Sequence, residues 1–277
     1  MTMPDTKPLP DLLAMHPLLP LAWEAAHRAG AFLRDERPDD LVIDTKSTAT
    51  DVVSAMDRNA EAMIIEDLLG TRPEDGLLGE EGGERFGTSG VRWVVDPLDG
   101  TVNYLHRIPM WGVSIAAELD GRSEVGVIVV PEFGETYIAV RGKGAWLVRD
   151  GVGERLVGSA CEHLPAAIVA TGFGYAADRR QRQMQVMEVL ITQVADIRRM
   201  GAAVVDFCWL ARGRVDAYFE HGLNPWDMAA GGLVVSESGM AYTGLSGDDP
   251  SGFFVAAAPA IVDDLRAALV TLRADEV

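Results

Sequence analysis

The stretch Trp93–Asn103, WVVDPLDGTVN, decides how the rest of the chain is organised. Its apolar, β-branched beginning predicts a buried strand. The strand delivers two carboxylates, Asp96 and Asp99, and the proline between them fixes the backbone. Gly100 then allows the chain to turn, and Thr101 begins a helix. A strand that ends in acids and continues into a helix N-terminus predicts a cation site beside an anion site.

The Asp-x-x-Asp spacing alone leaves an alternative open, because two aspartates in a turn often only cap a short helix. Two other segments favour the cation site. LLGEEG at 77–82 is a second apolar strand that ends in acids, among them Glu80. NPWDMAAG at 224–231 places Asp227 at the start of an Ala/Gly-rich helix. Together the three segments favour a cation site over two aspartates that only cap a helix.

These three segments resemble the signature of the inositol monophosphatase family. The Gly-Glu-Glu turn, the Asp-Pro-Leu-Asp-Gly-Thr-x-Asn segment and the Trp-Asp-x-Ala-Ala-Gly helix start stand in the family's order, and the likeness extends roughly from Leu21 to Leu272. The resemblance implies an α/β (α+β) fold, a layered αβαβα sandwich of the sugar-phosphatase type with the site between two lobes. We expect an N-terminal arm over 1–20, a lobe with most metal ligands over 21–157, and a lobe with Asp227 and the substrate contacts over 158–277.

Composition limits the classes of ligand. The 277 residues include 42 Asp and Glu against 24 Lys and Arg, and a net charge of −18 repels nucleic acid, so we expect no such partner. The same charge means that a phosphorylated substrate requires metal cations in the pocket. Cys161 and Cys208 form no Cys-x-x-Cys pair and suit a reducing cytosol, which predicts a cytoplasmic protein. No run approaches 18 apolar residues, so we expect no membrane partner.

Periodicity and turn signals predict the main elements. Helices are expected over 21–35 and 54–69, and Asp57 is spaced as a cap of the second one. A mostly antiparallel sheet then extends to a boundary near Gly158. From about residue 166 strands and helices alternate, which predicts a second sheet covered by helices. The proline-rich residues 1–20 are expected to form a loosely ordered arm.

The resemblance also implies the chemistry of the site. An all-oxygen ligand set selects Mg²⁺ or Mn²⁺ over zinc, and two or three Mg²⁺ ions are expected. The implied metal ligands are Glu80, Asp96, the Leu98 carbonyl, Asp99 and Asp227. Glu80 and the Thr101 hydroxyl would orient the attacking water, and Asp57 would lie near the metals. The N–H groups of Gly100 and Thr101 would bind phosphate oxygens. Lys46 is expected at the outer edge of the site.

The alcohol half of the substrate is expected at Glu220, whose carboxylate would accept a hydrogen bond from a sugar or inositol hydroxyl. Asp99, Ala203 and Asp227 complete the implied substrate contacts, although Ala202 stands where relatives often have Ser or Thr. The predicted reaction is hydrolysis of a small phosphorylated alcohol, most of all inositol 1-phosphate, by a homodimer. Histidinol phosphate, another sugar or nucleotide phosphate, and a weakly catalytic regulatory binding partner remain as alternatives.

A rival motif occurs at Gly172–Ala177, GFGYAA, which matches the outline of a dinucleotide-binding fingerprint. The acid that should end the following strand, Asp196, instead precedes it, and no second mononucleotide half follows. We therefore interpret the motif as a tight turn near the mouth of the substrate site. Arg198 and Arg199 are assigned either to substrate phosphate or to a dimer face.

Overall fold

The computed structural model describes residues 5–37, 43–45 and 52–276, with the backbone alone for 43–45 and 52–54. Lys46 lies outside the described residues. The helices are α1 (Leu9–Leu13), α2 (Leu19–Asp35), α3 (Ala55–Thr71), α4 (Thr101–Leu105), α5 (Ala177–Leu190), α6 (Ala203–Ala211), α7 (Pro225–Glu237) and α8 (Val262–Thr271). The strands are β1 (Thr6–Pro8), β2 (Ile43–Thr45), β3 (Val52–Ser54), β4 (Gly76–Gly79), β5 (Gly83–Arg85), β6 (Val91–Asp99), β7 (Gly112–Leu119), β8 (Arg122–Val130), β9 (Glu135–Val140), β10 (Gly144–Arg149), β11 (Val152–Arg155), β12 (Ile168–Thr171), β13 (Asp196–Arg198), β14 (Ala217–His221), β15 (Ala241–Gly244) and β16 (Phe253–Ala257).

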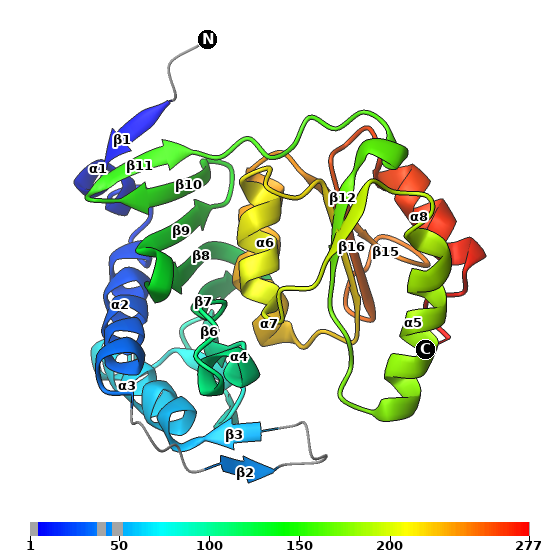
Figure 1. Ribbon diagram of the computed structural model, residues 1–277. Helices are drawn as coiled ribbons and strands as arrows, with labels where there is room; N and C mark the ends of the chain where they lie inside the picture. Colours follow the sequence, from blue (N-terminus) through cyan, green and yellow to red (C-terminus); the bar gives the residue numbers. More distant parts are fainter. Residues whose placement is uncertain (1–4, 38–42, 46–51, 277) are drawn as a thin grey trace.

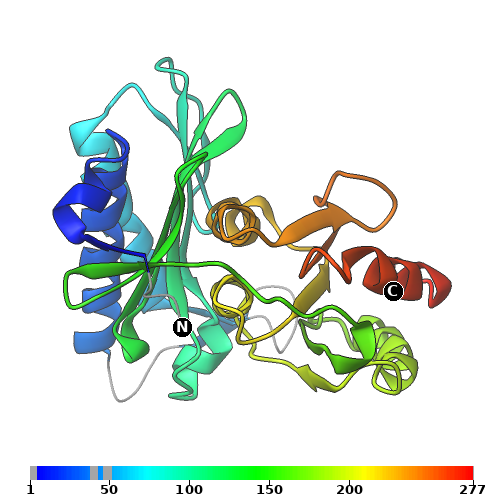
Figure 2. The same ribbon diagram turned by 90° about the horizontal axis from the view of Figure 1, so that it is seen from above.

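Five layers make up the molecule (Figures 1 and 2). A nine-stranded sheet, in the order β1-β11-β10-β9-β8-β7-β6-β4-β5, is covered on one face by α2 and α3. Helices α6 and α7 cover its other face and separate it from a five-stranded sheet in the order β13-β12-β14-β16-β15. Helices α5 and α8 lie outside that second sheet (Figure 2). The predicted αβαβα sandwich is confirmed.

Strand β6 shows how the sequence pattern builds these layers. Trp93 and Val95 belong to the apolar cluster beneath α2 and α3, whereas Val94 belongs to the cluster that faces α6 and α7. Successive side chains of a strand point to opposite faces, so an apolar run without alternation is expected where both faces are covered. By the same period Asp96, two residues after Val94, points toward the layer of α6 and α7. The acidic end of the strand therefore meets the middle of the molecule.

The N-terminal segment is ordered, and the prediction of a loosely ordered arm is wrong for residues 5–20. Strand β1 pairs antiparallel with β11, and helix α2 begins at Leu19. Leu12 is fully buried and packs so closely on Gly153 that a Cβ there would lie 2.3 Å from its Cδ1. The arm is ordered because it supplies apolar side chains and hydrogen bonds to the edge of the large sheet.

The second sheet is mixed. Strands β12, β13 and β14 run parallel, while β16 pairs antiparallel with both β14 and β15. Strand β15, which follows α7 directly, was not predicted from the sequence pattern. The chain passes from the first sheet to the second between Arg155 and Ile168. None of the helices in the described part of the chain combines the length and the apolar character that crossing a membrane requires.

The buried position of Leu12 leads to a stability prediction. Truncation to alanine removes apolar contacts from the core edge, so Leu12→Ala should lower the free energy of unfolding by about 2–5 kcal/mol in urea denaturation. The neighbouring exposed acid provides the control, since Asp11→Ala should change it by less than about 0.5 kcal/mol. Equal urea midpoints for Leu12→Ala and wild type would show that the segment does not stabilise the fold.

Candidate active site

A cavity of about 220 Å³ opens between the two sheets, where the N-terminal ends of α4, α6 and α7 meet the end of β6. The sequence-predicted residues that line it are Glu80, Asp96, Leu98, Asp99, Gly100, Thr101, Ala203, Glu220 and Asp227. Asp57 lies behind this lining, where its Oδ2 accepts a hydrogen bond of 3.3 Å from the Thr101 hydroxyl. The predicted catalytic, metal-binding and substrate-binding residues that the structure describes therefore gather at one place, although they come from both lobes.

The turn after β6 has little freedom. The Asp96 Oδ1 accepts a hydrogen bond of 3.0 Å from the Leu98 N–H, and the pairing of β6 with β7 shifts register between Asp96 and Asp99. Gly100 has a φ of 86°, and a Cβ there would lie 2.7 Å from the Met110 carbonyl oxygen. Only glycine fits such a left-handed and crowded position. This turn directs both aspartates and the start of α4 into the cavity.

Asp99 and Asp227 are each fixed by a backbone N–H group. The Asp99 Oδ2 accepts a hydrogen bond of 2.6 Å from the Val204 N–H in the first turn of α6. The Asp227 Oδ2 accepts one of 2.7 Å from the Asn224 N–H, which forms part of a capping box at the start of α7. Because the N-terminal end of a helix carries partial positive charge, α6 and α7 stabilise these two anions.

Burial makes the acids of the cavity costly in their charged form. It raises the pKa of Asp96 well above the ordinary range, with further increases from the charges of Glu80 and Asp99. Asp99 has its pKa raised in the same way by burial and by Asp227. Burial raises the pKa of Asp227 to about 6, against the lowering effect of its hydrogen bonds with Asn224. A bound cation would remove most of this cost.

The ligand chemistry fits a hard divalent cation, because the four side chains of the lining that would bind it, Glu80, Asp96, Asp99 and Asp227, are all carboxylates. In the portion of the chain that the structure describes, no three His, Cys, Asp or Glu side chains stand close enough together to hold one ion. Carboxylates repel one another, and a bound cation would offset this repulsion.

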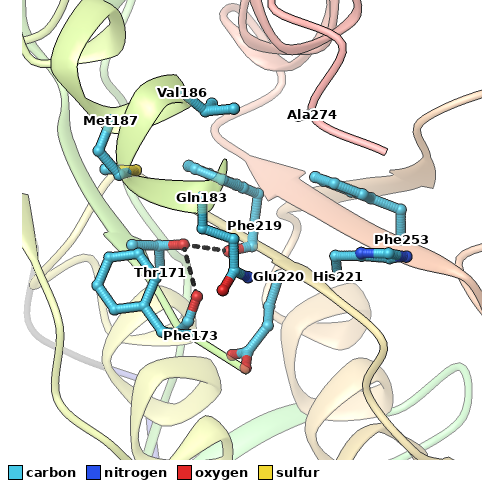
Figure 3. Close-up of a pocket in the computed structure, with 11 residues that line it drawn as sticks. Thr171, Phe173, Gln183, Val186, Met187, Phe219, Glu220, His221, Phe253 and Ala274 are labelled. Carbon is cyan, nitrogen blue, oxygen red and sulfur yellow. Dashed lines mark hydrogen bonds between the residues drawn. The ribbon is translucent and has the colours of Figure 1, made fainter. Parts of the chain in front are cut away.

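The other end of the cavity includes Glu220. This residue also lines a neighbouring pocket, together with Phe173 and His221 (Figure 3). The Tyr218 hydroxyl donates a hydrogen bond to its Oε2. A Cβ at Gly172 would lie 2.0 Å from that same oxygen, so glycine is required there. Burial raises the pKa of Glu220 to about 7, while the Tyr218 hydrogen bond lowers it.

The GFGYAA segment is explained by the same contacts. Its first four residues line the cavity, as the interpretation of a turn near the substrate mouth predicted. A Cβ at Gly174 would lie 2.5 Å from the Arg179 Cδ, and one at Gly222 would lie 2.5 Å from its Nη2. The glycines therefore make room for two charged side chains, Glu220 and Arg179, and this is a sufficient reason for the motif.

Two charged residues of the cavity were not predicted, Asp206 and Arg179. Asp206 is buried in α6, whose sequence AVVDFCWLA is otherwise apolar. An acid in the middle of such a helix is a signal that could have identified it. Arg199, which had two possible assignments, lines the cavity, whereas Arg198 forms an ion pair with Asp196 at 2.6 Å.

The five-layer sandwich with an acidic cavity between its sheets defines the structural class of the chain as a layered α/β fold. The model of the inositol monophosphatase family matches residues 14–275, and the chain belongs to this family. It is 39% identical over 265 residues to Nus factor SuhB of Escherichia coli K12, which covers 94% of this chain and 97% of the relative. It is 37% identical over 287 residues to inositol-1-monophosphatase of Mycobacterium leprae, covering 97% and 96%. The crystal structure of extragenic suppressor protein suhB from Bartonella henselae superposes with a TM-score of 0.85 at 36% identity, covering 92% of this chain and 98% of that one.

The crowded acids predict a coupling of stability to pH and metal. The pKa values of Asp227 and Glu220 are raised to about 6 and about 7, so the folded protein holds more protons than the unfolded chain between about pH 4 and pH 7. The protons held by Asp227 and Glu220 stabilise the folded state relative to the unfolded chain, and this stabilisation is lost as pH rises through the window. The increase in melting temperature caused by MgCl₂ should be larger at about pH 8 than at about pH 5.

Differential scanning fluorimetry with MgCl₂ or EDTA at both pH values measures this increase. The exposed acid variant Asp263→Asn should behave like wild type, since its side chain lies away from the cavity. An increase that is the same at both pH values, or absent, would contradict the assignment of a cation to these acids.

Proposed function

We propose that this protein is a Mg²⁺-dependent phosphomonoesterase that hydrolyses a small phosphorylated polyol, with inositol 1-phosphate as the best candidate. The observation that carries this proposal is the joining of the four acids Glu80, Asp96, Asp99 and Asp227 with three helix N-termini in one cavity. The acids provide for cations, and the helix N-termini provide for a phosphate anion. Membership of the inositol monophosphatase family supports the same reaction.

The residues that would hold the metal are Glu80, Asp96, Asp99, Asp227 and the carbonyl of Leu98. We propose two or three Mg²⁺ ions per site, with Mn²⁺ as a possible substitute. When bound, such ions neutralise phosphate charge, acidify water and stabilise the leaving alkoxide. The set of hard oxygen ligands, with no thiol or imidazole among them, supports Mg²⁺ over softer metals.

The protein's own groups position the reactants. The Thr101 hydroxyl lies 3.0 Å from the Leu98 carbonyl oxygen and 3.3 Å from the Asp57 carboxylate, so two acceptors fix its orientation. This Thr101–Asp57 pair, with Glu80 across the cavity, would orient the attacking water and accept its proton. The N–H groups of Gly100 and Thr101 would donate to phosphate oxygens. Asp99 and Asp227 would hold the phosphate end of the substrate through the metals.

The alcohol end favours hydroxyl groups over a cationic leaving group. Glu220 is an acceptor for a hydroxyl of the substrate, and Ala203 adjoins it in the lining. The guanidinium groups of Arg179 and Arg199 lie close enough to lower the pKa of Glu220. Their positive charge would repel the ammonium group of histidinol phosphate, so a neutral polyol is the better fit.

A regulatory binding role remains the second candidate. Relatives of this chain have two kinds of name, Nus factor SuhB and inositol-1-monophosphatase, so names alone do not decide. The complete set of acids in the cavity supports catalysis. We also propose a cytoplasmic homodimer that binds no nucleic acid or membrane. Two free thiols suit the cytoplasm, and the exposed Met184 of α5 and Ile191, which directly follows this helix, offer apolar contact surface.

Phosphate release from inositol 1-phosphate, histidinol phosphate and phosphoadenosine in the presence of MgCl₂ tests the reaction. Asp99→Asn should lower kcat/KM by about 100-fold or more, because each factor of ten corresponds to about 1.4 kcal/mol of lost transition-state stabilisation. Asp120→Asn, in an exposed hairpin turn, is the matched control and should retain full activity. The proposal fails if wild type releases no phosphate, or if Asp99→Asn stays within about tenfold of it.

The ratio of kcat/KM for inositol 1-phosphate to that for histidinol phosphate tests the substrate class. We expect the ratio to exceed one for wild type and to fall for Glu220→Gln, because an amide is a weaker acceptor for hydroxyl groups than a carboxylate. Gln keeps the size of the side chain, so packing against Gly172 is preserved. An unchanged ratio would show that Glu220 does not contact the leaving group.

A further inference from the structure

Asp206 is the one buried acid of the cavity that the proposed mechanism does not use. It lies in α6, one turn after Ala203, and both residues line the cavity. Residues three apart on a helix share a face, so the start of α6 presents the alanine and the acid side by side. The side chain is almost fully buried, with 2% of the residue exposed. Asp206 is therefore held in the wall of the substrate site and not in bulk solvent.

One oxygen of the Asp206 carboxyl group lacks a hydrogen bond. Its Oδ1 is buried and has no hydrogen-bond partner among the described residues. A buried polar atom left without a hydrogen bond costs free energy, and native structures contain few of them. In an enzyme, such a group in the wall of a substrate cavity indicates that a ligand supplies the missing donor.

The surroundings of Asp206 identify the kind of donor. Burial raises the pKa of Asp206 well above its usual range, the charges of Glu220 and Asp99 raise it further, and the Arg199 guanidinium acts in the opposite direction. Tyr218, which fixes Glu220, packs edge-on against the ring of Phe207, the residue that follows Asp206, with ring centroids 5.0 Å apart. Two carboxylates from different elements, α6 and β14, thus lie together at the alcohol end of the cavity. Two acceptors on rigid elements match two hydroxyl groups on a ring.

We propose that Asp206 is a specificity-determining residue, which together with Glu220 accepts hydrogen bonds from two hydroxyl groups of the leaving alcohol. This inference rests on the proposed phosphatase function. It adds that the alcohol part of the substrate must carry further hydroxyl groups that Asp206 and Glu220 can bind. A site built to hydrogen-bond hydroxyl groups discriminates strongly against an analogue without them, because its buried acceptors are then left unpaired. Phosphate esters of alcohols that lack further hydroxyl groups should therefore be poor substrates.

The test compares inositol 1-phosphate with cyclohexyl phosphate, whose ring has the same size and no hydroxyl group. For wild type, kcat/KM should be at least about 100-fold higher for inositol 1-phosphate. Asp206→Ala should lower the value for inositol 1-phosphate by about 10- to 100-fold, the loss expected when one partner of a buried hydrogen bond is removed, and leave that for cyclohexyl phosphate unchanged. Asn keeps the shape of the side chain, so kcat/KM of Asp206→Asn for inositol 1-phosphate should lie between the values of wild type and Asp206→Ala. Asp263→Asn is the control with an exposed acid.

The ratio of the two substrates does not depend on the fraction of folded protein, so a partly unfolded variant still reports on recognition. If wild type hydrolyses neither ester, the proposed function itself is wrong. If wild type is active and both Asp206 variants lose activity equally on the two substrates, or lose none, Asp206 does not recognise hydroxyl groups and the inference is overturned. A melting temperature that stays at or above that of wild type in both variants would separate recognition from a structural role.

Discussion

The burial of several carboxylates in one cavity is the constraint on which the rest of the structure depends. In a chain of net charge −18 the acids cannot be neutralised by a surplus of lysine and arginine. Backbone dipoles offset the free-energy cost of burying these carboxylates. At the start of α6 and of α7, the N–H groups of Val204 and Asn224 each donate a hydrogen bond to one of the acids. Placing α6 and α7 between two sheets is therefore an electrostatic arrangement as well as a way to fill the core.

The same arrangement explains why the site lies between the lobes. The hydrogen bond from Val204 to Asp99 joins a helix that packs on the second sheet to a strand of the first sheet. Glu135 of the first sheet forms ion pairs with Arg212 and Arg214, which follow the other end of α6. Polar contacts thus fix both ends of this helix, and apolar packing fixes its length. The result is a rigid wall that holds two acids, Asp99 and Asp206, at a set separation.

Much of the fold and part of the site were predictable because their signals are local. The apolar run, the proline and Gly100 predict strand, turn and helix within one short stretch, and the structure contains all three. Order in the N-terminal segment was not predictable, since β1 pairs with a strand that lies far along the chain. Arg179 was missed for the same reason, because the packing of α5 brings it to the cavity and no spacing in the sequence indicates this. Asp206 has a local signal, an acid within an apolar helix, but its place in the cavity depends on how α6 packs.

The pairing of β1 with β11 has a consequence for the behaviour of the protein in solution. A nine-stranded sheet has two edges, and an open edge is a template for joining another chain. At one edge β1 occupies the hydrogen-bonding groups of β11, and a proline ends the new edge strand. At the other edge β5 is only three residues long and exposes Glu84 and Arg85. Both edges of the sheet are thus formed by short strands, which offer little backbone for pairing with another chain, and removal of β1 would leave the longer β11 as the edge strand.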